Sequence, residues 1–236
     1  MRKRWIKRAM AAAMLCAIYL LSREGAILAG QEKTGNKGTI VIDSGHGGID
    51  PGVVGIEGLE EKGINQKIAG YLGENLREEG YKIVFTREDD RGLYEEDSSN
   101  KKRQDLENRC ALIEKEAPLL TVSIHQNSYQ DEEVCGPQVF YYTDSEEGKG
   151  LAECIQKALN EELEIQNPRK AKANDSYYLL KKGRGTVNIV ETGFLTNPRE
   201  TELLQTEAYQ RKCAGAISSG ILKFLKTVEK NGEDVV

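Results

Sequence analysis

Two histidines, the only two in the chain, follow apolar segments that resemble β-strands. His46 lies in the glycine-rich stretch VIDSGHGGIDPG, and His125 lies near the end of the apolar run LLTVSIHQN. Glu191 ends a third apolar run, VNIVE, and Glu61 follows the glycine-rich loop just before a predicted helix. Because the carboxyl ends of strands in an open α/β sheet meet at one edge, we expect these four side chains to converge.

Two histidines and two glutamates at one sheet edge meet the requirements of a catalytic zinc site. Such a site takes three protein ligands from His and carboxylate groups and leaves a fourth position for water. The metal lowers the pKa of that water toward ~7, and a further carboxylate can carry the proton. A single histidine is more often structural, and Glu61 within EEK could be part of a solvated charge run. Burying Glu191 within NIVETGFL would be costly without a partner or metal.

The glycines around His46 suit a loop that approaches a ligand closely. Gly45, Gly47 and Gly48 let the backbone turn tightly where side chains would obstruct it. A phosphate-binding loop is an alternative, but the stretch matches neither GxxxxGK[ST] nor GxGxxG. A nucleophilic serine is another alternative, but the chain has no GxSxG motif.

Strand-like and helix-like segments alternate along the chain. Apolar residues recur every three or four positions in four segments, which predicts helices near residues 64–80, 106–113, 151–159 and 209–224. Short apolar or β-branched runs predict six strands, at residues 39–43, 81–87, 119–127, 137–144, 177–181 and 186–195. This order predicts a single three-layer α/β domain with a mostly parallel twisted sheet of about six strands flanked by helices. We place this catalytic domain at residues 39–228.

The N-terminus has the features of an export signal. Five basic residues within positions 2–8 precede the unbroken apolar stretch 9–21, which is shorter than the ~20 residues of a spanning helix. We expect residues 1–29 to be a signal peptide or an N-terminal membrane anchor, and an ordinary core helix is the alternative. Residues 30–38 are expected to form a linker and residues 229–236 a flexible tail. The catalytic domain would then lie outside the cytoplasmic membrane and meet it only through the N-terminal segment.

The charge balance excludes one class of function, and the cysteine spacing predicts no framework for zinc or for disulfides. Residues 1–29 hold six basic residues and one acidic residue, which leaves 27 Lys and Arg against 37 Asp and Glu. An acidic domain of this kind does not suit nucleic-acid binding. The four cysteines after residue 29 form no CxxC pair and predict mostly buried, isolated thiols, although Cys135, in a predicted loop, could form a disulfide.

The motifs of residues 39 to about 226 resemble, in the right order, those of the zinc-dependent N-acetylmuramoyl-L-alanine amidases of the amidase type 3 family. The segments that carry the resemblance are IVIDSGHGGIDPGVVG, GLEEKGIN, VFTREDD, DLENRCALI, VSIHQNS and VNIVETGFLTNPRE. The resemblance implies that His46, Glu61 and His125 bind Zn²⁺. It also implies that Glu191 is the catalytic glutamate. Ser44 departs from the proline that is usual in the family, but this change removes no ligand.

Two further residues match positions that recur beside the site in the family. The resemblance suggests Arg109 and Asn127 as substrate-binding residues. The implied substrate is the muramoyl peptide of peptidoglycan, and an accessory or activating protein is a further expected partner.

The sequence is similar to the CwlD-type sporulation amidases in two respects. It shows no wall-binding repeats, and it contains the segments KKRQDLENR and NPRKAKANDSYYLLKK. This similarity implies removal of stem peptides in the spore cortex, a step toward muramic-δ-lactam. Two alternatives remain. One is a catalytically inactive amidase-like module that binds glycan or a partner, and the other is a zinc peptidase that acts on the stem peptide.

Overall fold

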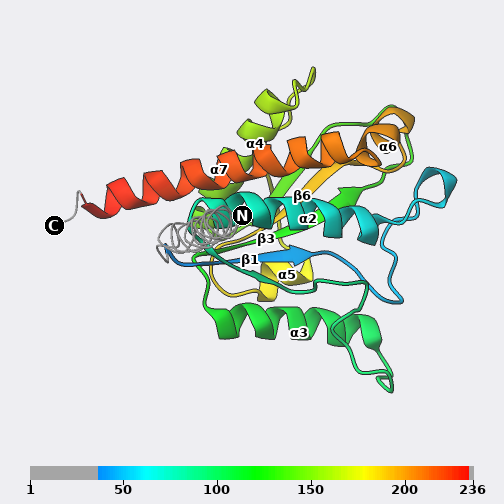
Figure 1. Ribbon diagram of the computed structural model, residues 1–236, viewed down its shortest axis with the longest axis horizontal. Helices are drawn as coiled ribbons and strands as arrows, with labels where there is room; N and C mark the ends of the chain where they lie inside the picture. The colour runs from blue at the N-terminus through cyan, green and yellow to red at the C-terminus, as the bar shows by residue number, and fades with distance from the viewer. Residues whose placement is uncertain (1–36, 234–236) are drawn as a thin grey trace, which may run out of the picture.

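A six-stranded sheet forms the centre of the molecule (Figure 1). The computed structural model describes residues 37–233, so the expected signal or anchor and most of the expected linker lie outside the described residues. The strand order is β2-β1-β3-β6-β4-β5. The strands are β1 (Thr39–Ser44), β2 (Lys82–Phe85), β3 (Leu120–Asn127), β4 (Gln138–Tyr142), β5 (Lys172–Asn174) and β6 (Val187–Phe194).

The sheet is mostly parallel, as the sequence predicted. Strands β2, β1, β3 and β6 pair in parallel, whereas β4 runs antiparallel to β6 and parallel to β5. The three-layer α/β class is therefore confirmed. The parallel part of the sheet brings the carboxyl ends of β1 and β3 to one edge, which is where the sequence placed the two histidines.

Helices cover both faces of the sheet (Figure 1). The α-helices are α2 (Glu61–Glu78), α3 (Lys101–Glu116), α4 (Glu146–Glu162), α5 (Tyr178–Lys182), α6 (Pro198–Leu204) and α7 (Glu207–Glu233), and a short 3₁₀ turn η1 spans Ile56–Gly58. Helices α2 and α4 pack on one face with α7 laid across both of them, while α3 and α5 cover the other face.

Alternation along β1 explains how one strand serves two hydrophobic clusters. Ile40 and Ile42 pack into the cluster formed with α2, α4 and α7, whereas Val41 joins the cluster formed with α3 and α5. All three side chains are fully buried. Successive side chains of a strand point to opposite faces, so a strand covered on both faces is apolar throughout.

Segment 177–181 was predicted as a strand, and the structure corrects this prediction to the helix α5. The side chain of Asn174 accepts hydrogen bonds from the backbone N–H groups of Ser176 and Tyr177, which turns the chain before the helix begins. Adjacent residues Leu179 and Leu180 are both buried, which a strand exposed on one face would not allow. The aromatic pair that suggested a strand lies at the start of the helix.

Two elements besides the short η1 turn were not predicted from the sequence. Strand β5 has three residues, none of them buried, so it leaves no hydrophobic pattern. Helix α6 begins with a readable signal, because the Asn197 side chain accepts a hydrogen bond from the backbone N–H of Glu200 and Pro198 follows the cap. An Asn cap, a proline at the first helical position and an acidic residue two positions later are typical of a helix start.

Helix α7 continues to Glu233, beyond the expected domain boundary at residue 228. Residues 229–233 are thus helical, and residues 234–236 lie outside the described part of the chain. Among the described residues, no helix has the length and apolar character needed to cross a membrane. The four cysteines within this range are free, with Cys213 buried and Cys135 exposed.

Candidate metal and catalytic site

The loop after β1 presents His46 in an unusual backbone conformation. His46 has φ = 63°, in the left-handed region, and Gly47 and Gly48 follow with φ of 130° and 59°. A left-handed conformation costs an ordinary residue about 1–2 kcal/mol, so other contacts must hold it. A side chain at Gly45 would place its Cβ 2.2 Å from the His125 ring. A glycine at position 45 is therefore required for the two histidines to approach each other.

Glu61 is the first residue of α2, and its carboxylate is held from several sides. It accepts hydrogen bonds from the backbone N–H of Val53 (2.8 Å) and Gln126 (3.0 Å) and from the Asn65 side chain (3.1 Å). Burial alone would raise its pKa, but hydrogen bonds and charges from the two histidines lower that pKa well below its usual range. Glu61 is thus a buried carboxylate that stays ionised.

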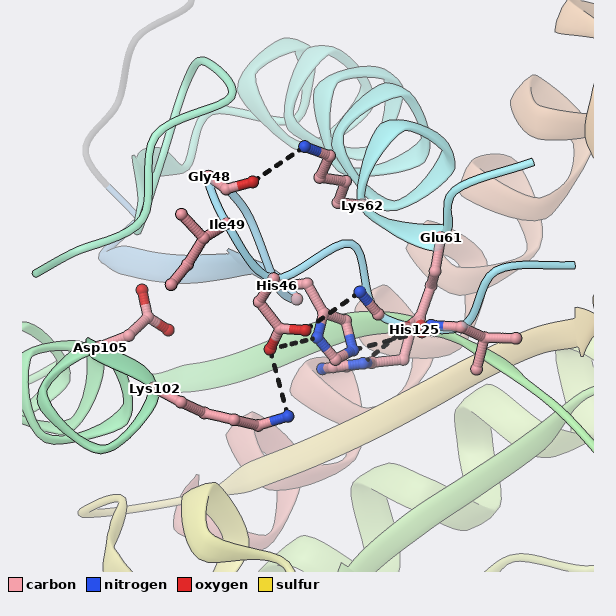
Figure 2. A network of polar contacts seen from close by, with 12 residues as sticks. His46, Gly48, Ile49, Glu61, Lys62, Lys102, Asp105 and His125 are labelled. Atoms are coloured by element: carbon pink, nitrogen blue, oxygen red, sulfur yellow. Dashed lines mark hydrogen bonds and ion pairs between the residues drawn. The ribbon is translucent and has the colours of Figure 1, made fainter. Parts of the chain in front are cut away.

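The side chains of His46, Glu61 and His125 form one cluster (Figure 2). The Nε2 atom of His46 lies 3.2 Å from Oε2 of Glu61, and Nδ1 of His125 lies 2.9 Å from Oε1. The two imidazole rings stand edge to face with centroids 4.9 Å apart. One potential ligand atom from each residue lies within 4.8 Å of the others, so the three residues predicted as ligands do come together.

Asp50 orients the His46 ring, and the sequence reasoning missed this residue. Its Oδ2 lies 3.0 Å from Nδ1 of His46, which leaves Nε2 free to face Glu61. Metal-binding histidines usually donate their other ring N–H to a carboxylate in this way. Lys102 of α3 reaches the same Asp50 oxygen at 3.3 Å (Figure 2). A carboxylate four residues after the histidine, within the same tight loop, was the available signal.

Glu191 lies beside this cluster on β6. The sequence analysis placed it at a strand end, but β6 continues to Phe194, and Glu191 pairs in register with His125 on β3 and with Gln138 on β4. Its Oε2 atom is buried and has no hydrogen-bond partner. Burial raises the pKa of Glu191 to about 7, although the charge of His125 opposes the shift.

The donor set and the unpaired oxygen fit a bound metal. Two imidazoles and one carboxylate are the ligand types of a three-ligand catalytic zinc site. His46 and His125 both contact Glu61 in the described structure, and burial opposes a positive charge on His125, yet contact with Glu61 raises the pKa of His125 to about 9. The carboxylate of Glu61 therefore stabilises positive charge at this cluster, and Glu191, whose Oε2 atom has no hydrogen-bond partner, lines the same cavity.

A cavity of about 500 Å³ joins these groups. Its walls come from the loop after β1, the start of α2, the end of β3, strand β6, and the helices α3 and α5. They include all four residues predicted to do the chemistry, and also Lys102, Asn127, Tyr177 and Tyr178. Asn127 thus lies on the cavity wall, where its side-chain oxygen accepts a hydrogen bond from the backbone N–H of Ser128.

Arg109 was suggested as a substrate-binding residue, but its guanidinium is occupied by the protein itself. The side chain is 2% exposed and donates to Asp43, to both oxygens of Asp105, and to the backbone oxygens of Ser44 and His46. Burial alone would lower the pKa of Arg109, but the carboxylates of Asp43 and Asp105 raise that pKa above its usual value. The geometry favours a positioning role for Arg109.

The raised pKa of Glu191 predicts how pH affects the stability of the metal-free protein. The ordinary pKa of a glutamate is 4.5, whereas that of Glu191 in the folded protein is about 7. Between these two pH values the folded protein keeps the carboxyl proton of Glu191, while the unfolded chain releases it. The free energy of unfolding therefore falls as the pH rises through this window, by at most ~3 kcal/mol. Glu191→Gln removes the ionisation, so we expect it to stabilise the metal-free protein at pH 8 but not at pH 4. Urea unfolding at both pH values measures this difference, and an equal effect at pH 4 and pH 8 would contradict the assigned pKa.

Comparisons with known proteins agree with this geometry. A family profile for N-acetylmuramoyl-L-alanine amidases matches residues 40–223. The germination-specific N-acetylmuramoyl-L-alanine amidase of Bacillus subtilis is 37% identical over 188 residues, which cover 78% of this chain and 78% of the relative.

Solved structures of amidases share the fold. The CwlD amidase from Clostridioides difficile, solved in complex with the GerS lipoprotein, is 38% identical with a TM-score of 0.79, over 81% of this chain and 100% of that chain. The amidase AmiC2 of Nostoc punctiforme is 31% identical with a TM-score of 0.70, over 80% of this chain and 97% of that chain. With the family match across the whole sheet and the site, these similarities show that the chain is an enzyme of the N-acetylmuramoyl-L-alanine amidase family.

Proposed function

We propose that this protein is a zinc-dependent hydrolase that cleaves the amide bond between N-acetylmuramic acid and L-alanine in peptidoglycan. The observation that carries the proposal is that three ligand side chains and Glu191, whose Oε2 atom is buried and unpaired, line one cavity. His46, Glu61 and His125 would hold the Zn²⁺. When bound, the metal supplies Lewis-acid polarisation of the scissile carbonyl and acidification of water.

Glu191 would carry the protons of the reaction. Hydrolysis of an amide requires a proton to leave the attacking water and another to reach the departing nitrogen of L-alanine. A carboxyl group whose pKa is about 7 can serve as base in the first transfer and as acid in the second near neutral pH. The unpaired Oε2 atom is the available site for this proton.

The surrounding residues would keep the machinery in place. Asp50 fixes the tautomer of His46 through Nδ1, and three hydrogen-bond donors hold the carboxylate of Glu61 in one orientation. Such supporting contacts are worth 10–100-fold in metal affinity or activity in other metal sites. The side chains of Tyr177 and Asn127 line the cavity and are available to contact substrate.

We extend the proposal to the biological setting. The similarity to a germination-specific amidase and to an amidase solved with a lipoprotein supports a role in the spore cortex, with removal of stem peptides on the way to muramic-δ-lactam. The same comparison supports an accessory or activating protein as a partner.

Export of the domain is part of the same proposal, because peptidoglycan lies outside the cytoplasmic membrane. The basic and apolar segments within residues 1–29 support a cleaved signal peptide or a retained anchor. Residues 1–29 fused to a reporter that is active only outside the cytoplasm test this directly. Activity should depend on the apolar stretch 9–21, and a reporter confined to the cytoplasm would contradict export.

Two other functions can be separated by product analysis. An inactive binding module would be expected to lack a ligand or the glutamate, whereas all four residues are present and converge. A zinc peptidase would cut within the stem peptide and leave L-alanine attached to muramic acid. Mass spectrometry of digested peptidoglycan distinguishes these products from free stem peptides.

A further inference from the structure

Two buried arginines donate hydrogen bonds to the backbone of the loop that carries His46. Arg87 lies after β2 and Arg109 lies on α3, and their side chains are 5% and 2% exposed. Together they donate hydrogen bonds to the carbonyl oxygens of three consecutive residues, Ser44, Gly45 and His46. We call this pair of side chains the arginine clamp.

Arg109 holds the two ends of the gripped segment. Its Nη1 donates to the carbonyl oxygen of Ser44 at 2.8 Å, and its Nη2 donates to that of His46 at 2.6 Å. The guanidinium is itself fixed by Asp105 on the same helix, at 2.6 Å from Nε, and by Asp43 at the end of β1. The guanidinium of Arg109 therefore connects α3 to His46, the residue whose imidazole faces Glu61.

Arg87 holds the first two residues of the segment. It donates to the carbonyl oxygens of Ser44 and Gly45, both at 3.0 Å, and to that of Lys62 in the first turn of α2 at 2.7 Å. Its five acceptors are four backbone carbonyls and the side-chain amide oxygen of Gln66, none of them a carboxylate. Burying a cation without a carboxylate partner is costly, so these contacts must offset that cost.

The clamp acts where the backbone needs support. His46 adopts φ = 63°, which an L-residue does not prefer, and the segment leaves β1 at this point. The carbonyl of His46 is one bond from the Cα that sets the direction of the imidazole. Because Arg87 also contacts the first turn of α2, the clamp connects the histidine loop to the helix that starts at Glu61.

We propose that Arg87 and Arg109 are positioning residues for the metal ligands, which set the affinity of the site for zinc by fixing the His46 backbone, and that Arg109 does not contact substrate. This inference rests on the proposed zinc site. A guanidinium with its donors committed to protein oxygens has none left for a ligand, although Arg109 borders the cavity. Lysine keeps the charge but cannot reproduce a planar fork that reaches several oxygens at once.

The test compares Arg109→Lys with Arg103→Lys, a matched control on the same helix whose side chain is 72% exposed. Zinc dissociation constants are measured by chelator competition, at a temperature below the unfolding midpoint of each metal-free protein. We expect Arg109→Lys to bind zinc about 10–100-fold more weakly and the control to match wild type. At saturating zinc, the KM for muramoyl peptide should stay at the wild-type value. A raised KM with unchanged zinc affinity would overturn the proposal, because it would mean that Arg109 contacts substrate.

Arg87→Lys provides a second, independent variant, with Arg91→Lys as its control in the same loop, where the side chain is 86% exposed. We expect weaker zinc binding for Arg87→Lys only. Amide hydrogen exchange of the metal-free proteins should also speed up at residues 45–48 without change in β3. If Arg109→Lys does not fold, Arg87→Lys decides whether the clamp sets the affinity of the site for zinc.

Zinc affinities within twofold of wild type in the folded clamp variants, together with unchanged exchange at 45–48, would overturn the proposal. A wild-type protein that binds no zinc would refute the zinc site itself. In that case the exchange measurement still decides whether the clamp fixes the loop.

Discussion

Glu191→Gln is expected to lower the rate of muramoyl-L-alanine amide hydrolysis by about 10²–10⁴-fold while zinc stays bound. Glutamine keeps the size and polarity of the side chain but cannot accept and return a proton. Glu191 has an unpaired Oε2 atom and a pKa raised by burial to about 7, which are the properties of a proton carrier. The variant should fold, because no hydrogen bond of Oε2 is lost.

Parallel measurements of zinc content and of released L-alanine amino termini test this expectation. Glu60→Gln is a suitable control, since Glu60 precedes the ligand Glu61 but its side chain is 49% exposed. Near-normal turnover with zinc bound would remove Glu191 from the mechanism. Loss of zinc together with activity would instead make Glu191 a ligand and would call the assignment of Glu61 into question.

His125→Ala is expected to weaken zinc binding severely and to lower the zinc-dependent activity with it. The free energy of zinc binding at four-ligand protein sites is ~10–16 kcal/mol, which is several kcal/mol for each ligand. Loss of one of the three ligands should therefore weaken zinc binding by at least ~100-fold. The Nδ1 atom of His125 contacts Glu61, and no other histidine besides His46 exists in the chain to replace it.

Metal content after dialysis and chelator competition measure this effect. Tyr129→Ala is a control two residues beyond the end of β3, because Tyr129 is 60% exposed. His46→Ala should behave like His125→Ala. Zinc retention at wild-type affinity by either histidine variant would contradict the ligand set.

The sequence predicted the sheet and the convergence of the site because both depend on strong, regular signals. Buried parallel strands are apolar throughout, and a polar side chain at the end of such a strand stands out. His46 and His125 could therefore be placed at one edge from the strand pattern alone. The separate roles of Glu61 and Glu191 came from the family resemblance, because position alone left either one as the ligand.

The contacts of the arginine clamp could not be predicted, because they join residues that are distant in the sequence. Arg109 contacts a carbonyl 63 residues away at His46, and Arg87 contacts one 43 residues away at Ser44. Nothing in the local pattern of VFTREDD or ENRCALI indicates that either side chain is buried. Helix α5 was missed for a different, local reason, since the aromatic residues that favour strands lie where the Asn174 side chain turns the chain into a helix.

Mass spectrometry of peptidoglycan digested by the purified protein, first stripped of metal and then supplied with Zn²⁺, tests the central claim most directly. With zinc, we expect stem peptides that carry a free L-alanine amino terminus, together with glycan strands whose muramic acid has lost its peptide. Without metal, neither product should form. Cleavage within the stem peptide, undiminished activity in the presence of a chelator, or the absence of any product from zinc-loaded protein would contradict the proposed function.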